Sequence, residues 1–279
     1  MMRQKSFEQQ TIKDDFMFGA VMRDPKKCKP LLEHILGEKI KEIKYPELQK
    51  VIDNTMEAKS VRLDVYVEDT ENTVYNIEIQ TTDKKNLPKR MRYYQGMIDL
   101  NIISKGKDYK QLKKSYIIFI CDYDEYGKGR HIYTFENICL EDESIHFGDD
   151  TVKIVLNTKG TADDVSEELK NVLHYIGGEE PKGKLAKELD EGVENVKKSE
   201  EWRRAYMTLL MRDREKIELG ENKRLIKQIR TKFLREKPAI IIAEEVEIDV
   251  VYVENIISLI KEHPDWDDED IASEIETNE

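Results

Sequence analysis

Two acidic residues and an amide stand at a spacing that brings them onto one face of a hairpin. Asp64 and Glu78 are 14 residues apart, and Gln80 follows Glu78 by two. If the chain turns near Glu71, residue 64 lies opposite residue 78. Gln80 shares the face of Glu78, because alternate residues of a strand point the same way. We therefore expect two carboxylates and a carboxamide to converge on one side of this hairpin.

Such a carboxylate pair is suited to holding a hard divalent cation. Carboxylates placed directly across a strand pair repel each other, and bound Mg²⁺ or Mn²⁺ removes that penalty because these ions take oxygen ligands. The cation acidifies a water ligand that can attack a phosphodiester, and it stabilises the charge that builds on phosphorus. The alternative is a hairpin whose polar face is merely solvated, which is common on exposed strands.

The hairpin is predicted from alternation of apolar and polar residues in two segments, 61–67 and 75–80, separated by the polar stretch 68–73. This period of two is typical of strands. The apolar positions are Val61, Leu63, Val65, Val67, Tyr75, Ile77 and Ile79. They predict a packed face behind the polar one.

The elements around the hairpin indicate an α/β fold with helices on either side of a sheet. Helical spacing predicts helices within 12–36, over 87–103 and over 162–176, and apolar runs predict strands at 115–121, 131–135 and 152–156. Residues 122–130 contain two glycines and predict a loop, whose acidic residues we interpret as solvated rather than calcium-binding.

The composition changes at residues 179–183, where we place a domain boundary. The chain is thus predicted to comprise an α/β domain over 1–178 and an all-helical region over 179–279. The long charged segment 185–233 is typical of a surface helix or a self-association seam. Residues 238–261 predict two short helices, which we interpret as a packing or homo-oligomerisation module, with DNA contact as the alternative.

The overall composition excludes several classes of protein. The chain has 279 residues and a net charge of -12, and no apolar run approaches the roughly 20 residues needed to cross a bilayer. Its three cysteines form no CxxC pair, and its histidines show no zinc-ligand spacing. We expect a reduced, cytoplasmic setting and no membrane association.

A basic stretch interrupts the acidic total. Ten Lys and Arg residues lie between Lys84 and Lys114, opposed only by Asp99 and Asp108, which leaves about +8. Local charge of this kind can steer a polyanion such as DNA, although a solvated face would have the same composition.

Six motifs in order resemble one family. They are Lys13-Asp14-Asp15-Phe16-Met17-Phe18, Arg62-Leu63-Asp64-Val65, Ile77-Glu78-Ile79-Gln80, Lys89-Arg90-Met91-Arg92-Tyr93-Tyr94, Tyr116-Ile117-Ile118-Phe119-Ile120, and Asp124-Glu125-Tyr126-Gly127-Lys128-Gly129-Arg130 followed by Ile132-Tyr133-Thr134-Phe135. Together they resemble the Rpn recombination-promoting nucleases, which are PD-(D/E)XK nuclease family transposases. The resemblance covers about residues 12–178.

The resemblance implies a restriction-endonuclease-like core, with a mixed central sheet flanked by helices in α-β-β-β-α-β order. It also implies DNA hydrolysis with Mg²⁺ (or Mn²⁺). Carried over position by position, Asp64 binds the metal and Glu78 is the second acid. Asp15 matches an acidic position on the first helix that helps to hold the metal. Arg90 and Arg92 match a basic helix that contacts phosphates.

Two positions depart from the wider superfamily. Leu63 stands where the motif has proline, which matters little to the chemistry. Gln80 stands where lysine is usual, so it brings hydrogen bonding without charge. Lys84 or Lys85, just beyond the strand, is a candidate for the missing cation.

These observations predict a metal-dependent DNA endonuclease associated with recombination or transposition. Gln80 is expected to orient the attacking water. The residues expected to contact DNA are Lys84, Lys85, Lys89, Arg90 and Arg92. The alternative is a catalytically degenerate relative that binds DNA or protein.

Overall fold

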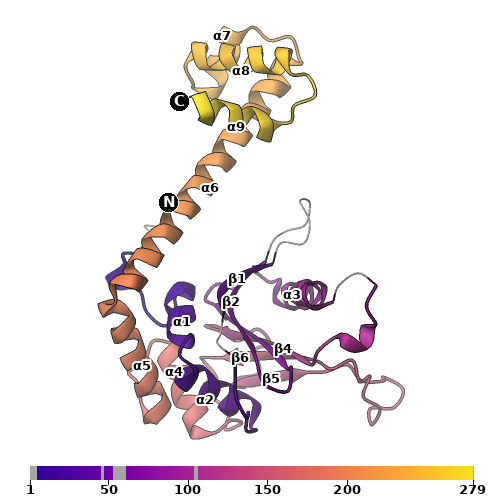
Figure 1. The fold of residues 1–279 in the computed structure, drawn as a ribbon, viewed down its shortest axis with the longest axis vertical. Helices are drawn as coiled ribbons and strands as arrows, with labels where there is room; N and C mark the ends of the chain where they lie inside the picture. Colours follow the sequence, from indigo (N-terminus) through magenta and orange to yellow (C-terminus); the bar gives the residue numbers. More distant parts are fainter. Residues whose placement is uncertain (1–4, 45–46, 53–60, 104–105, 279) are drawn as a thin grey trace. The chain divides into compact units, whose positions relative to one another are not determined.

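The computed structural model describes residues 5–44, 47–52, 61–103 and 106–278, with the backbone alone for 47–52, 61–62, 216 and 276–278. The chain divides into two compact units, Met1–Arg203 and Arg204–Glu279. Each unit has its own core, and the two are described separately below (Figure 1).

A mixed sheet forms the centre of the first unit. In spatial order its six strands are β1-β2-β3-β4-β6-β5. Their bounds are β1 Glu47–Ile52, β2 Val61–Glu68, β3 Val74–Gln80, β4 Ser115–Cys121, β5 Ile132–Phe135 and β6 Thr151–Asn157. β3, β4 and β6 run parallel, whereas β1, β2 and β5 pair antiparallel with their neighbours. The prediction of a mixed sheet flanked by helices is confirmed.

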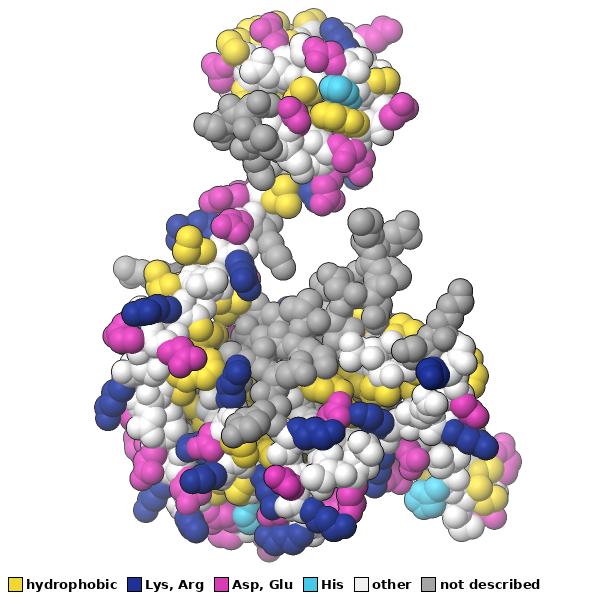
Figure 2. Space-filling model, in the orientation of Figure 1, with side chains coloured by type: hydrophobic (Ala, Val, Ile, Leu, Met, Phe, Trp, Pro, Cys, Tyr) yellow, Lys and Arg dark blue, Asp and Glu magenta, His cyan; other side chains and the backbone are white. Residues whose placement is uncertain are grey.

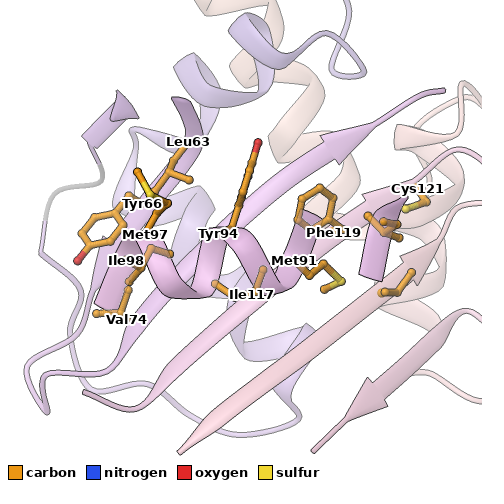
Figure 3. Packing of buried hydrophobic residues seen from close by; sticks show 12 residues of the cluster. Leu63, Tyr66, Val74, Met91, Tyr94, Met97, Ile98, Ile117, Phe119 and Cys121 are labelled. Carbon is orange, nitrogen blue, oxygen red and sulfur yellow. The ribbon is translucent and has the colours of Figure 1, made fainter. Parts of the chain in front are cut away.

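The continuous apolar run predicted as a buried strand is β4, and every residue of it is buried. Strands paired in parallel on both sides are covered on both faces, which explains why this segment shows no alternation. Helix α3 (Leu87–Ile102) covers one face, where Met91, Tyr94 and Ile98 pack with Ile117 and Phe119 of β4 (Figure 3). This packing fixes the rotation of α3 about its axis, and so decides which of its residues face the end of β3.

Four other helices pack together on the far side of the sheet from α3 (Figure 1). They are α1 Asp15–Met22, α2 Pro25–Leu36, α4 Glu167–Ile176 and α5 Gly183–Lys198. Short 3₁₀ turns at Phe7–Gln9 and Tyr109–Gln111 complete the unit. Asp24-Pro25 separates α1 from α2, and Gly37 ends α2 in the left-handed conformation.

Three elements differ from the prediction by more than a residue or two. Strand β1 was not predicted, since its sequence lacks a period of two. Helix α4 begins at Glu167 instead of residue 162, because Ser166 caps it and Asp164 accepts a hydrogen bond from the N–H of His131. The long helix predicted over 185–233 is interrupted at Ser199, whose backbone is extended, and this divides it into α5 and α6 (Glu200–Phe233).

The second unit is built from the part of α6 after Arg203 and three more helices, α7 Ala239–Val246, α8 Val250–Glu262 and α9 Asp268–Asn278. Its core includes the buried residues Ile226, Ile229, Ile242, Val253, Ile256 and Ile271. Glu247 ends α7 in a left-handed conformation, and two residues later Asp249 caps α8 through the N–H of Val251. None of the described helices is both long and apolar enough to cross a membrane.

Along the chain, the division between the two compact units falls after Arg203, whereas the sequence predicts a boundary near residue 178. The reason for the later division is that α5 packs against α1, α2 and α4. A functional division into 1–178 and 179–279 stays a prediction.

Candidate active site

The candidate carboxylates lie where β2 and β3 stop pairing with each other. The antiparallel register runs from Glu68↔Val74 to Val65↔Ile77, which sets Asp64 across from Glu78. Beyond this pair, β2 continues against β1 and β3 continues against β4. The two strands therefore part at the position of the acidic pair.

Side-chain oxygens accept the hydrogen bonds of two backbone N–H groups at this point. The N–H of Asp64 donates to Oε1 of Glu78 at 3.0 Å, and the N–H of Ile79 donates to Oδ2 of Asp64 at 3.1 Å. Buried backbone N–H groups need an acceptor, and each carboxylate supplies one to the opposite strand. Both carboxylates are thereby fixed in position by the main chain.

The electrostatics of the pair are unfavourable without a ligand. Glu78 is fully buried, and Asp64 is exposed to only 6%. Burial and then the neighbouring charge of Asp64 raise the pKa of Glu78 well above its usual range. Two acids held close together in a low-dielectric environment need positive charge nearby.

Arg90 of α3 supplies a positive charge to this group. Its Nη2 lies 3.3 Å from Oε2 of Glu78, its Nη1 donates to Oε1 of Gln80, and its Nε lies 3.0 Å from the hydroxyl of Tyr94. The guanidinium carbon also lies 5.1 Å from the ring centre of Phe119. Arg90 is therefore turned toward the acidic pair rather than out into solvent.

The lysines proposed from the sequence as the missing cation are placed differently. Lys84 is exposed, and Lys85 forms an ion pair with Asp83. Among the described residues, the basic side chain that contacts Glu78 and Gln80 is Arg90.

Gln80 uses both ends of its carboxamide within the protein. Its oxygen accepts from Arg90, and its Nε2 donates to the carbonyl oxygen of Thr82 at 2.5 Å. The side chain is buried, with 8% exposed. Both ends of the amide thus have partners within the protein, and the expected role of Gln80 in orienting a water stays a prediction.

Two neighbours of the site were not predicted from the sequence. Asn76 lies on the same face of β3 as Glu78 and is fully buried, and its side chain lies close enough to Glu78 to oppose, in small part, the rise in the pKa of that acid. Burial, and then the charge of Glu78, raise the pKa of Tyr94 to about 12, so its hydroxyl stays protonated beside Arg90. The signals were present: Asn76 continues the alternation of Glu78 and Gln80, and Tyr94 follows Arg90 by one helical turn.

The donor set fits a small hard cation. Mg²⁺ in proteins is typically held by one or two carboxylates, with waters and substrate phosphates completing its shell. Asp64 and Glu78 provide two buried carboxylates, and the neighbouring guanidinium of Arg90 balances only one of their two negative charges.

Asp15 does not join this pair in a three-ligand group. Over the described residues, no three His, Cys, Asp or Glu side chains form a cluster that could hold a metal ion. Asp15 instead lies at the start of α1, where its Oδ1 accepts from the N–H of Phe16 at 2.8 Å.

The other candidate DNA-contacting residues are on the surface. Lys89 and Arg92 are exposed on α3, on the side away from Met91 and Tyr94. Figure 2 shows Lys and Arg interspersed with Asp and Glu on the face in view, without a single broad basic patch.

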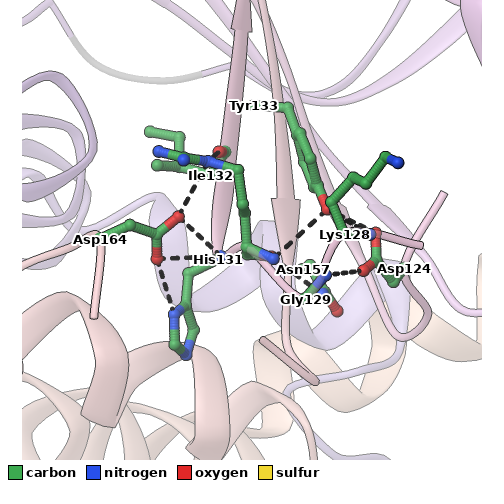
Figure 4. A network of polar contacts seen from close by, with 9 residues as sticks. Asp124, Lys128, Gly129, His131, Ile132, Tyr133, Asn157 and Asp164 are labelled. Carbon is green, nitrogen blue, oxygen red and sulfur yellow. Dashed lines mark hydrogen bonds and ion pairs between the residues drawn. The ribbon is translucent and has the colours of Figure 1, made fainter. Parts of the chain in front are cut away.

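A second polar network lies near the ends of β5 and β6 (Figure 4). Asp124 accepts hydrogen bonds from the N–H of Tyr126 at 3.1 Å, the N–H of Gly129 at 2.7 Å and the hydroxyl of Tyr133 at 2.8 Å. Burial opposes its ionisation, but these donors outweigh burial and lower the pKa of Asp124. The 122–130 segment is thus a loop organised around a satisfied carboxylate.

Asp164 has a similar role in the same network. It accepts from the N–H of His131 at 3.1 Å and lies 3.0 Å from Nδ1 of the His131 ring. Burial again opposes ionisation, yet the hydrogen bonds from His131 lower the pKa of Asp164.

Comparison with known proteins identifies the family. The model of the PD-(D/E)XK nuclease family transposases matches residues 14–237, which is well over half of the chain and includes both strands that carry the acidic pair. None of the curated proteins and none of the solved structures gives a match. With its mixed sheet and the acidic pair at the parted ends of β2 and β3, the chain belongs to the PD-(D/E)XK nuclease family transposases.

Proposed function

We propose that this protein is a metal-dependent DNA endonuclease that hydrolyses phosphodiester bonds in recombination or transposition. The observation that carries the proposal is the buried pair of Asp64 and Glu78, held by backbone N–H groups at the point where two strands part. Buried acids with a raised pKa are typical of functional sites. Membership of a nuclease family supports the same reaction.

Asp64 and Glu78 would hold Mg²⁺ or Mn²⁺. When bound, the cation activates water and stabilises negative charge on the phosphate. The protein's own part is to present two fixed carboxylate oxygens, because the N–H groups of Asp64 and Ile79 orient them before substrate arrives. Lys89 and Arg92, exposed on α3, would contact the DNA backbone and position it.

Plasmid cleavage tests the proposal. Wild type should cut supercoiled DNA with Mg²⁺ or Mn²⁺ and should stop when EDTA is added. Asp64→Ala and Glu78→Ala should each lose about 10³-fold or more in rate, since loss of the cation removes several kcal/mol of transition-state stabilisation.

A matched control is Glu143→Ala, which removes an exposed acid far along the chain from the pair. It should cut like wild type. If correctly folded wild type cuts no DNA with any divalent cation, the hydrolytic proposal is wrong and the chain is a binding relative of the family.

We further propose self-association through the second unit. Ile240, Ile241 and Val251 on α7 and α8 are exposed, at 53%, 39% and 58%. Exposed apolar side chains in a charged helical unit favour burial against a partner. Light scattering of the full chain should give more than a monomer mass, and Ile240→Glu should reduce it; a monomer at every concentration tested would exclude this proposal.

A further inference from the structure

The guanidinium of Arg90 is held as a directed group. Four contacts fix it: Nη1 to Gln80, Nη2 to Glu78, and both Nε and Nη2 to the hydroxyl of Tyr94, the last at 2.6 Å. It also lies over the rings of Tyr94 and Phe119, at 5.0 and 5.1 Å from their centres. An arginine packed in this way has lost its rotamer freedom before any ligand binds.

One donor of this group is left for a ligand. A guanidinium carries five N–H groups, and the four contacts use one from Nε, two from Nη2 and one from Nη1. Within the described part of the chain, the second N–H of Nη1 has no acceptor. The side chain of Arg90 is 31% exposed, whereas that of Glu78 is 1% exposed, so a ligand from solvent can reach Arg90 while Glu78 is covered.

We propose that Arg90 is a catalytic residue that binds a non-bridging oxygen of the scissile phosphate, and that Gln80 and Tyr94 are positioning residues that aim it. This inference rests on the proposed phosphodiester hydrolysis. It assigns to a helix residue the positive charge that a lysine at position 80 supplies elsewhere in the superfamily. It also separates Arg90 from Arg92, which is exposed on α3 and would grip the backbone away from the reacting atoms.

The chemistry suits an arginine. Negative charge grows on the phosphate oxygens as the water attacks, and a fixed cation beside them stabilises the transition state more than the ground state. Arg90 stays charged at every relevant pH and donates in a planar fork that matches phosphate. No proton leaves Arg90, so the group is unchanged after each turnover.

The same geometry explains why glutamine stands at position 80. Its carbonyl oxygen accepts from Nη1 of Arg90. A lysine there would remove that acceptor and set an ammonium against a guanidinium, with like charges in contact. A lysine at position 80 and an arginine at position 90 held by Gln80 are therefore alternative ways to supply the positive charge, and one excludes the other.

Gln80→Lys gives the sharpest test, because two mechanisms predict opposite signs. If Gln80 is simply a weakened catalytic lysine, Gln80→Lys cuts plasmid DNA faster than wild type. If Gln80 positions Arg90, Gln80→Lys cuts about tenfold more slowly or worse. A faster Gln80→Lys enzyme overturns the inference.

Substitutions of Arg90 and Tyr94 test the other contacts. Arg90→Gln should lose about 10²- to 10³-fold in turnover, as for loss of one transition-state donor. Arg90→Lys should recover part of that loss by restoring charge, and Tyr94→Phe should lose a few-fold because the ring remains but the acceptor goes. Lys187→Gln, a control that removes an exposed cation from α5, should keep wild-type turnover.

A binding measurement separates a phosphate contact from a purely structural role. In EDTA, affinity for a DNA duplex falls with salt, and the slope of log K against log salt counts phosphate contacts at about 0.9 each. Arg90→Gln should reduce that slope by about 1, whereas a structural arginine would leave it unchanged. Circular dichroism of each variant shows whether it is folded. If Arg90→Gln does not fold, Gln80→Lys and Tyr94→Phe still test the inference.

The outcomes distinguish the two proposals. A folded wild type that does not cut DNA refutes the hydrolytic function and this inference together. An active wild type with a faster Gln80→Lys variant, or with an Arg90→Gln variant of unchanged turnover and salt slope, refutes the inference alone.

Discussion

Two polar clusters lie at strand ends of the same sheet, and they treat their carboxylates in opposite ways. Asp124 and Asp164 each accept several hydrogen bonds, and their pKa values are lowered. Glu78 is buried beside Asp64, and its pKa is raised. A satisfied carboxylate stabilises the loop around it, whereas an under-compensated pair stores electrostatic free energy that a cation can release. The difference favours the pair of Asp64 and Glu78, rather than the network of Asp124 and Asp164, as the proposed site.

The largest difference expected between the two clusters is in their affinity for a metal ion. Glu78→Gln removes one of two charged ligands and should weaken Mn²⁺ binding by about tenfold or more, measured by calorimetry. Asp124→Asn, the matched substitution in the other cluster, should bind Mn²⁺ as wild type does. Equal losses in both variants would contradict our separation of the two clusters.

The free energy of unfolding should depend on the carboxylates of the other network, of which Asp124 is a member. Asp124→Ala leaves the hydroxyl of Tyr133 and the N–H groups of Gly129 and Tyr126 without their acceptor. These groups are half-buried, and a lost hydrogen bond costs about 0.5–1.5 kcal/mol net, so the free energy of unfolding of the first unit should fall by about that amount or somewhat more. Urea denaturation measures the change. An unaltered midpoint would mean that water replaces the carboxylate freely.

The two clusters should also differ in the pH dependence of stability of the metal-free protein. Because the pKa of Glu78 is raised on folding, its contribution to stability is fully present below the unfolded pKa and is lost as pH rises through the folded one. Asp124, with a lowered pKa, contributes above its unfolded pKa and loses that contribution as pH falls.

The measurement compares wild type with Glu78→Gln in EDTA between pH 5 and pH 8. Wild type should lose about 1.4 kcal/mol relative to the variant for each unit by which folding raises the pKa of Glu78. Saturating Mg²⁺ should cancel the loss in wild type and leave Glu78→Gln unaffected. Parallel pH curves for the two proteins would show that Glu78 stays ionised throughout.

Local periodicity accounts for what the sequence could predict about the site. Alternation on both arms of the hairpin fixes which residues share a face, and a turn near Glu71 fixes the register. Asp64 was therefore expected across from Glu78, and the pairing of Val65 with Ile77 agrees. The buried strand β4 was predictable too, because a continuous apolar run indicates burial on both faces; the mixed character of the sheet was expected from the family resemblance.

The rest depends on packing that no local pattern encodes. Arg90 reaches Glu78 only because Met91, Tyr94 and Ile98 fix the rotation of α3 on the sheet. Strand β1 is an edge strand without alternation, and it forms because β2 offers it a partner. The interruption at Ser199 separates two segments with the same helical pattern, so composition could not reveal it.

The two backbone N–H groups that hold the acidic pair are also built-in probes. The amide of Asp64 points at one carboxylate and the amide of Ile79 at the other. When a cation draws electron density from those oxygens, both hydrogen bonds weaken, and the amide proton resonances should move upfield in nuclear magnetic resonance spectra. Two peaks of the main chain would then report site occupancy directly, without a dye, a substrate or a cut strand of DNA.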